Sequence, residues 1–294
     1  MTVKDILRRN LPDLTAGQSK LAAALLADYP FAALHPIQHL ADATGLSPPS
    51  ISRFVQRLGF GGFSEFQQAL IAELREGSRS PRDLHATADA ASRADFLETY
   101  SGRFGSVAGN LSSTVPQQQI DSVTALLADT GRDIYVRGGR ISDSMARFLS
   151  LHLRQIRPGV HHLGDDPAMW PDALLQARRK DVLVLFDFRR YQPGIVRLAA
   201  AARQHCRMQT VLVTDRWQSP AARYCTHVIA LPIEIGTAWD TMASVTAVLE
   251  TLIVAVSEHD WQRTEKRMER WDAILELLQP PDPLSTTPNQ MESS

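Results

Sequence analysis

The sequence is poor in cysteine and close to neutral. Its 294 residues contain two cysteines, Cys206 and Cys225, which are too few for a disulfide framework and show no metal-ligand spacing. Such sparse cysteine usage is typical of a reducing compartment, and we expect a cytoplasmic protein. The formal net charge of −1 excludes a uniformly basic surface. Any contact with nucleic acid therefore requires a local basic patch.

Long apolar runs are also missing. The longest, such as VLVLF at residues 182–186, have the length of one strand, whereas a helix that crosses a bilayer needs about 20 apolar residues. The N-terminal segment MTVKDILRRN lacks the apolar core of a signal peptide. We therefore expect no membrane partner.

Hydrophobic periodicity divides the chain into four parts. Residues 1–76 have the spacing of amphipathic helices, whereas residues 77–95 are small, polar and charged, which predicts a linker. Residues 96–279 begin with two helices, broken near Pro116, and continue as an α/β domain. Residues 280–294 are polar and proline-rich, which predicts a disordered tail. The total length suits two domains of roughly 100–200 residues each.

The segment PIQHLADATGLSPPSISRFVQRLGF, residues 36–60, predicts a helix-turn-helix. Two short helices flank a turn at Gly45, and apolar side chains of the first helix can pack on Ile51 and Val55 of the second. No acidic residue occurs from residue 43 to residue 64, so the segment is locally basic. The alternative is a helical hairpin that packs on another element, because helix pairs joined by a glycine are common.

The second helix of this motif carries polar residues suited to double-stranded DNA, which is the predicted partner. Residues near the start of such a helix reach base edges, and Ser50 and Arg53 are the best candidates because arginine can make two hydrogen bonds to guanine. Ser47 and Arg57 are better placed for phosphate. The predicted DNA-contacting residues are Ser47, Pro49, Ser50, Ser52, Arg53, Gln56 and Arg57.

Strands alternate with helices from residue 133 onwards. The expected strands are IYVRGG, VHHL, DVLVLFDF, QTVLVTD and HVIALPI, and the segments between the first four have helical spacing. Apolar strands in this order predict a parallel sheet covered by helices on both faces. Two final helices are expected at residues 240–258 and 261–279.

Two segments, LTAGQSKLAAALLADYP and IQHLADATGLSPPSISRFVQRLGFGGFSEFQQAL, resemble the N-terminal domain of the RpiR family of bacterial transcription regulators. The LGF-GGF-EF run after the second helix is the most specific feature. The family joins this domain to a sugar isomerase (SIS) domain, and the resemblance extends over residues 11–279. It implies an all-α helix-turn-helix domain followed by a three-layer α/β SIS domain with a five-stranded parallel sheet.

The resemblance places an effector site on two loops. In open parallel sheets, ligands bind beyond the carboxyl ends of the strands. The loop after IYV carries Gly138, Gly139, Arg140 and Ser142 and leads into a helix whose N-terminus can hold an anion. The glycines are expected to let the backbone approach the ligand, and Ser142 to donate its hydroxyl. This loop is similar to the first phosphosugar loop of the family, except that Arg140 replaces a usual glycine.

The loop after DVLVLF departs further from the family. Family members have serines and a threonine that cradle phosphate, whereas Asp187 and Arg189 stand here at serine positions, Gln192 stands at the threonine, and Arg190 lies between them. In one interpretation Arg140, Arg189 and Arg190 bind an anionic ligand, while Asp187 orients an arginine or accepts from a sugar hydroxyl or amine. In the other, Asp187 pairs with Arg140 or Arg189 and fills an empty pocket. The predicted effector is a sugar phosphate or a sugar acid.

Other polar residues are weaker candidates. Thr214, Asp215 and Ser219 follow QTVLVTD and could line the pocket edge, although turn formation is the more common role of such residues. His161 and His162 are adjacent in an expected strand and face opposite sides, so no metal site is predicted.

These features predict a ligand-responsive DNA-binding regulator without enzymatic activity or cofactor. An isomerase is one alternative, since some SIS domains resemble aldose–ketose isomerases, but no glutamate or histidine stands out as the base. A SIS domain that only oligomerises is the other. We expect a homo-oligomer, a dimer or tetramer held by helices 96–129 and 240–279, because paired DNA half-sites mirror a two-fold axis. Trp239, Met242 and Glu250 are expected in the core or at that contact.

Overall fold

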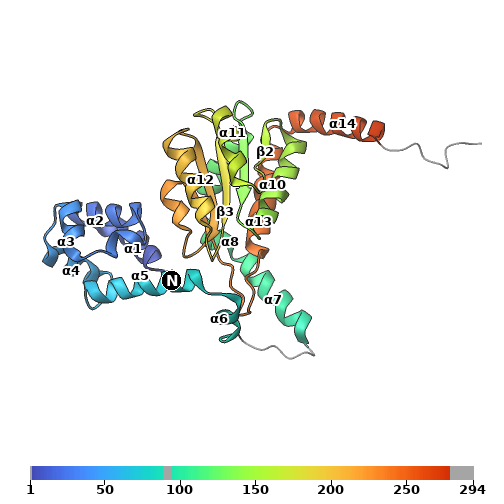
Figure 1. The fold of residues 1–294 in the computed structure, drawn as a ribbon. Coiled ribbons are helices and arrows are strands. Elements are labelled where there is room, and N and C mark those ends of the chain that lie inside the picture. Colours follow the sequence, from blue (N-terminus) through green and yellow to red (C-terminus); the bar gives the residue numbers. More distant parts are fainter. Residues whose placement is uncertain (1, 89–94, 279–294) are drawn as a thin grey trace, which may run out of the picture.

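A computed structural model describes residues 2–88 and 95–278 of the chain (Figure 1). Part of the predicted linker, residues 89–94, and the predicted tail at 280–294 lie outside the described residues. The N-terminal helices form one group, the α/β domain forms another, and helix α5 reaches from the first towards the second (Figure 1).

The N-terminal part is helical and has a core of its own. Its elements are α1 (Val3–Asn10), η1 (Leu11–Asp13), α2 (Ala16–Ala27), η2 (Phe31–Ala33), α3 (Ile37–Thr44), α4 (Pro48–Arg57) and α5 (Phe63–Ser78). The buried side chains that join these helices include Leu7, Leu21, Leu25, Phe54, Phe66 and Leu70. A further short helix, α6 (Pro81–His85), lies in the stretch predicted as a linker.

Helices α3 and α4 form the predicted helix-turn-helix. The turn needs Gly45, which has a left-handed φ of 71° and donates its amide to the carbonyl of Ala41 at 2.8 Å. Leu40 lies in the same buried cluster as Ile51 and Val55 of α4. The packing of the two helices therefore follows from the apolar spacing in the sequence.

The C-terminal part is a three-layer α/β domain. Its helices before the sheet are α7 (Phe96–Gly109), α8 (Leu111–Thr114) and α9 (Gln117–Ala128), so the expected pair contains one short extra helix before Pro116. The following elements are β1 (Ile134–Gly138), α10 (Asp143–Ile156), β2 (Val160–His162), η4 (Pro167–Met169), α11 (Trp170–Gln176), β3 (Val182–Asp187), α12 (Pro193–Gln204), β4 (Gln209–Asp215), η5 (Pro220–Tyr224), β5 (His227–Leu231), α13 (Ala243–His259) and α14 (Trp261–Leu278).

The five strands form one parallel sheet in the order β2-β1-β3-β4-β5. Alternate side chains of each strand enter different clusters. Val136 and Val184 pack in the cluster that includes side chains of α9, α10 and α13, whereas Tyr135 and Leu183 pack in the cluster that includes side chains of α11 and α12. Helices thus cover both faces, and the predicted fold class is confirmed. In the register, Gly138 lies beside Phe186 and Asp187 beside Thr214, which brings the loops after β1, β3 and β4 to one edge.

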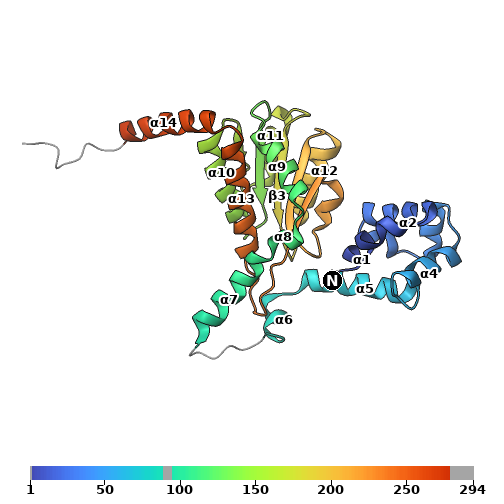
Figure 2. The ribbon, with the colours of Figure 1, turned by 180° about the vertical axis from the view of Figure 1, so that it is seen from behind.

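Helix α14 extends from the α/β domain on the side away from the N-terminal helices (Figures 1 and 2). Thr264 near its start is buried, but Trp271, Ile274, Leu277 and Leu278 are exposed, the last two by 85% and 77%. Among the described residues, none of the helices combines the length and the apolar character required to cross a membrane.

Candidate functional site

The exposed face of α4 carries the residues predicted to meet DNA. Ser47 is the N-cap, but its hydroxyl lies 2.9 Å from the hydroxyl of Ser50 and makes no hydrogen bond to the helix backbone. The guanidinium of Arg53 donates to Ser50 Oγ at 3.4 Å, and its side chain is otherwise open to solvent. Pro49 and Gln56 are also exposed, and Ser52 is half-buried. The structure therefore brings all these side chains to one face of the helix.

Arg57 is held in a fixed position at the end of α4. Its guanidinium donates to the carbonyl of Asp13 at 2.7 Å and to Oε1 of Gln18 at 3.0 Å. Both acceptors flank the start of α2, and the N-terminus of a helix carries a partial positive charge. Arg57 and this helix end together suit a phosphate group, as predicted for Arg57 from the sequence.

The loop between β1 and α10 is tied together by its own polar groups. Ser142 Oγ accepts the amide of Gly139 at 2.9 Å and donates to the carbonyl of Phe186 at 2.9 Å. The hydroxyl proton that we expected Ser142 to offer to a ligand is thus used inside the fold. Glycine at position 138 is required by the packing of the loop itself, because a Cβ there would lie 2.4 Å from the amide nitrogen of Asp143.

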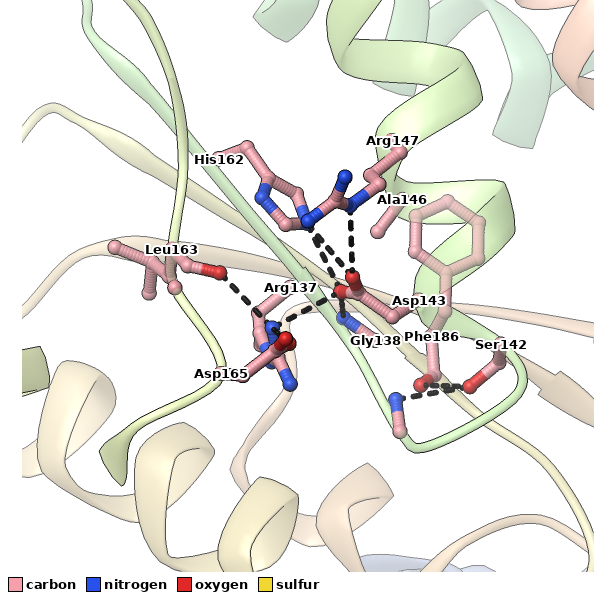
Figure 3. Close-up of polar contacts among 12 residues, drawn as sticks. Arg137, Gly138, Ser142, Asp143, Ala146, Arg147, His162, Leu163, Asp165 and Phe186 are labelled. Atoms are coloured by element: carbon pink, nitrogen blue, oxygen red, sulfur yellow. Dashed lines mark hydrogen bonds and ion pairs between the residues drawn. The ribbon is translucent and has the colours of Figure 1, made fainter.

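A charged cluster around the buried carboxylate of Asp143 supports this loop. Figure 3 shows Arg137, Arg147 and His162 converging on the carboxylate of Asp143. Asp143 Oδ1 also accepts the amide of Gly138 at 3.0 Å, and Nε2 of His162 lies 2.9 Å from the same oxygen. The cluster fixes the start of α10 relative to the carboxyl ends of β1 and β2.

The amides of this loop differ in what they contact. Those of Asp143 and Ser144 already donate to loop carbonyls. The amides of Arg140, Ile141 and Ser142 donate to no other described residue. The N–H groups available to an anion therefore lie in the loop at residues 140–142, and not in the first turn of α10 as the sequence suggested.

The loop after β3 is organised by the buried carboxylate of Asp187. Its Oδ1 accepts the amide of Gln192 at 3.1 Å, and its Oδ2 accepts the hydroxyl of Ser219. Neither Arg140 nor Arg189 pairs with it, so the predicted pairing of Asp187 with either arginine is wrong, and so is the idea that Asp187 orients one of them. The amide of Gln192 and the hydroxyl of Ser219 occupy the two carboxylate oxygens because both residues lie in segments next to the end of β3.

Burial dominates the titration of the two carboxyls at this edge. Burial raises the pKa of Asp187 to about 7, and the nearby charge of Asp215 acts in the same direction. The hydrogen bonds from Ser219 and Gln192 lower this pKa and oppose part of the shift. Burial likewise raises the pKa of Asp215 to about 6. Asp215 accepts the hydroxyl of Tyr191 at 2.7 Å and the amide of Trp217 at 3.0 Å.

Arg189 is the most buried cation of the loop. Its guanidinium lies 4.0 Å from the ring centroid of Trp217, its Nε lies 3.0 Å from Oδ2 of Asp240, and its Nη1 donates to the carbonyl of Glu76 at 3.4 Å. The N–H of Nε does not point at Asp240, and Nη2 lies 4.0 Å from Glu234. Nε and Nη2 therefore remain buried without a hydrogen-bond acceptor among the described residues. Such groups favour an acceptor brought by a ligand.

These loops enclose a cavity of about 350 Å³ at the carboxyl edge of the sheet. It holds four guanidiniums, from Arg79, Arg140, Arg189 and Arg190, against two carboxyls, from Asp187 and Asp240. The remaining lining residues are Pro81, Leu84, Gly139, Ile141, Ser142, Phe188, Gln192, Ala238, Trp239 and Met242. All the predicted effector residues except Gly138 thus line one cavity.

Part of this cavity comes from residues that carry no recognisable signal in the sequence. Arg79 comes from the predicted linker, and Asp240 follows the last strand, so neither stands in a motif. Two carboxylates, Glu234 and Asp240, follow the last strand, and nothing in the sequence shows that Asp240 lies beside Arg189.

Trp239, Met242 and Glu250 were expected in the core or at a subunit contact. Met242 packs against the core and also lines the cavity, Trp239 lines the cavity and is exposed, and Glu250 is exposed on α13.

Thr214 and Ser219 connect the neighbouring strand ends. Thr214 Oγ1 donates to the carbonyl of Asp187 and accepts the amide of Ser219, whose hydroxyl caps η5 through the amide of Ala221. This agrees with the turn chemistry favoured from the sequence. The two adjacent histidines face apart, since His161 stacks on Tyr135 while His162 contacts Asp143.

The β3–α12 loop also contacts the N-terminal helices directly. The amide of Arg190 donates to the carbonyl of Gly77 at 3.1 Å, and Arg189 donates to the preceding carbonyl, so the loop satisfies two carbonyls at the end of α5. A Cβ at Gly77 would lie 2.9 Å from the hydroxyl oxygen of Tyr191, which shows how closely the surfaces approach. The cavity and the N-terminal helices therefore share one loop.

Two family models match the chain. Residues 1–77 match the helix-turn-helix domain of the rpiR family, and residues 126–255 match the SIS domain. The sugar isomerase domain of an RpiR transcription factor from Sphaerobacter thermophilus is similar to 60% of this chain and 97% of that chain, with a TM-score of 0.55 and 18% identity. The NanR protein of Vibrio vulnificus, in complex with ManNAc-6P, is similar over 94% of this chain and 99% of its own, with a TM-score of 0.53 and 14% identity. At these identities the likeness shows the fold alone.

The raised pKa of Asp187 predicts a pH-dependent stability. Between about pH 4 and pH 7 the folded protein keeps a proton on this carboxyl that the unfolded chain has lost, so the free energy of unfolding falls as pH rises through this window. The slope from one such proton is at most about 1.4 kcal/mol per pH unit. Asp187→Asn is neutral at every pH and should remove this part of the slope in urea unfolding.

The exposed residue Asp172 on α11 provides a control, because Asp172→Asn changes one carboxyl away from the cavity. Its unfolding free energy should follow the wild-type pH dependence. Equal slopes for wild type and Asp187→Asn between pH 4 and pH 7 would contradict the assignment.

Proposed function

Because the chain belongs to the RpiR family of regulators, with the family's helix-turn-helix domain followed by a SIS domain, we propose that it is a transcription regulator that binds operator DNA through α4 and responds to a small anionic metabolite. The observation that carries the proposal is the arginine-lined cavity whose β3–α12 loop is bonded to the end of α5. A DNA target places the protein in the cytoplasm.

The cavity suits an anion. Arg140 and Arg190 are exposed at its rim, Arg189 has two buried N–H groups without an acceptor, and the free amides of 140–142 lie in a loop that lines it. Guanidiniums bind phosphate and carboxylate with paired hydrogen bonds. The complex of Vibrio vulnificus NanR with ManNAc-6P supports a phosphosugar, and a sugar acid would use the same donors.

An isomerase is less well supported. Among the described residues that line the cavity there is neither glutamate nor histidine. Burial raises the pKa of both lining carboxyls, that of Asp187 to about 7 and that of Asp240 to about 6. Both oxygens of Asp187 accept hydrogen bonds and the residue is 1% exposed, so it cannot reach a substrate carbon without a rearrangement of the loop. Asp240 lies 3.0 Å from Nε of Arg189, whose positive charge makes this carboxylate a weaker base. Support for a sensing rather than a purely oligomerising domain comes from the unpartnered N–H groups of Arg189.

The shared loop offers a route from effector to DNA. A ligand that draws the guanidinium of Arg189 towards the cavity would weaken its bond to the carbonyl of Glu76 and alter how α5 sits on the loop. Because α5 packs in the same core as α4, a shift of α5 would change the placement of the DNA-contacting face. Such coupling requires that the ligand binds the two arrangements with different affinity.

Substitutions on the DNA-contacting face should separate base contacts from phosphate contacts. Arg53→Ala should cost about 1–3 kcal/mol at the cognate operator and little on unrelated DNA, because a base contact carries the specificity. Arg57→Ala should weaken binding to all sequences alike, because its proposed target is phosphate. Fluorescence anisotropy with operator and scrambled duplexes at fixed salt measures both effects.

A matched control is Arg75→Ala, since Arg75 is exposed on α5 and has no predicted contact with DNA. It removes the same charge and should leave both affinities near wild type. Unchanged operator affinity in Arg53→Ala would rule out a base contact by this side chain.

Thermal unfolding with a panel of sugar phosphates, including ManNAc-6P, and sugar acids should identify a ligand that stabilises the protein by roughly 2.7 kcal/mol at 100 times its dissociation constant. Arg140→Gln should lower the affinity for that ligand. The double replacement of Arg140 and Arg189 with glutamine should abolish the effector response while operator binding persists. Arg197→Gln, which changes an exposed arginine of α12 outside the cavity lining, should respond as wild type. A double variant that responds at unchanged ligand concentration would place the pocket elsewhere.

We also propose that the second half of α14 joins two copies of the chain. Apolar or small side chains recur along it at alternating steps of three and four residues, the spacing of a coiled-coil seam. These positions are Trp261, Thr264, Met268, Trp271, Leu275 and Leu278. Thr264 is buried against the chain's own domain, whereas the following positions are exposed, and an exposed apolar helix end is marginal without a partner.

Replacing Leu275 and Leu278 together with glutamate should therefore disrupt the oligomer, with a loss of at least about tenfold in association. Ala273→Glu, on the opposite face of the same helix, is the control. Sedimentation velocity at micromolar concentration measures both. A monomeric wild type, or an unchanged oligomer in the double variant, would contradict this contact.

A further inference from the structure

A second cavity, of about 390 Å³, lies between the N-terminal helices and the edge strand β5. One wall comes from α1 and the end of α2, with Lys4, Arg8 and Tyr29, and the other comes from η5 and β5, with Arg223 and His227. Among the described residues that line it there is no aspartate or glutamate. It shares no lining residue with the arginine-lined cavity at the carboxyl edge of the sheet, which we call the effector cavity. We call this second cavity the interdomain cleft.

The ammonium of Lys4 is the central feature of the interdomain cleft. The residue is 7% exposed, yet its Nζ donates to a single acceptor, Oε1 of Gln218 across the domain boundary. In the parts of the chain that the structure describes, no carboxylate lies within 4.0 Å of it. An ammonium has three donors, and a buried charge without a counterion is costly.

The ring of Tyr29, whose centroid lies 5.3 Å from Nζ of Lys4, offsets part of this cost, but no neighbouring carboxylate balances the charge. Burial and the neighbouring Arg8 lower the pKa of Lys4 to about 8, and the more distant carboxylates of Asp5 and Glu73 only partly oppose them. Both oxygens of Glu73 are already engaged, with the amide of Val3 and the hydroxyl of Tyr29.

Two further cations, Arg8 and Arg223, line the interdomain cleft. Arg8 is exposed on α1 and has no ion pair among the described residues, while Arg223 on the opposite wall lies 3.4 Å from the carboxylate of Asp28. Three cations thus converge on the cleft from both domains, and Asp28 is the one carboxylate within ion-pair distance of any of them in the described chain.

We propose that the interdomain cleft is a second ligand site, which takes a metabolite-sized anion carrying phosphate or carboxylate groups. Its volume lies within the range of about 300–1,000 Å³ typical of small-molecule sites. Such an anion supplies the missing acceptors for Lys4 and bridges Arg8 to Arg223. Because the walls belong to different domains, the bound anion holds the N-terminal helices against β5 and provides an input to DNA binding separate from the effector cavity.

The test uses the full chain with pyrophosphate and citrate as probes, at constant ionic strength and without DNA. Isothermal titration should show saturable binding with a dissociation constant on the order of 1 mM or tighter, and the Tm should rise with probe concentration. Lys4→Met removes the charge and keeps an unbranched side chain. This variant should lose about tenfold or more in affinity, while its Tm without probe should be no lower than that of wild type.

Three further variants make the result decisive. Arg223→Gln changes an exposed side chain of the opposite wall and should also lose affinity, which covers the case in which Lys4→Met fails to fold. Arg197→Gln, which changes an exposed arginine of α12 that lines neither cavity, is the control and should bind the probes as wild type does. Arg140→Gln identifies any binding of the same anions in the effector cavity. The proposal is overturned by equal affinity in wild type and Arg223→Gln or Lys4→Met, by binding that only Arg140→Gln removes, or by no saturable binding at about 10 mM.

Discussion

The buried guanidinium of Arg189 is the interaction on which the rest of the arrangement depends. It stacks on Trp217 after β4, lies beside Asp240 after β5, and donates to the carbonyl of Glu76 at the end of α5. A buried cation requires compensation, so the segments that supply part of it lie close together, although Nε and Nη2 have no hydrogen-bond acceptor among the described residues. The same side chain thereby closes the base of a cavity and joins the two domains.

Around this cation, the neutral polar groups at the strand ends serve the fold itself. The hydroxyls of Ser142, Thr214 and Ser219 and the carboxylate of Asp187 bond one loop to the next. What remains for a ligand is guanidinium and free backbone amide. This balance is the basis of the proposal that the cavity takes an anion and not a neutral sugar.

The boundary between the domains is polar and contains two cavities with an excess of cations. One lies at the carboxyl ends of β1 and β3, against α5 and α6, and the other lies along β5, against α1 and α2. Interfaces between domains of one chain are generally more polar than permanent interfaces, and relative domain motion is common across them. If the two proposed sites bind anions, each anion changes the charge balance at this boundary, which is the physical basis proposed for two inputs to one DNA-binding domain.

The sequence by itself determined the helix-turn-helix, the parallel sheet and the loops of the effector cavity, because apolar periodicity, a left-handed glycine such as Gly45 and the strand–helix alternation are local signals. Only the tertiary structure decided which charges meet. Asp187 was expected beside an arginine, but its carboxylate accepts hydrogen bonds from Ser219 and Gln192. The carboxylate beside Arg189 is that of Asp240, which lies in a segment without a motif. Lys4 and Gln218 meet although they are 214 residues apart. Periodicity records which side of an element is buried, whereas the partner of a buried charge depends on how distant segments pack.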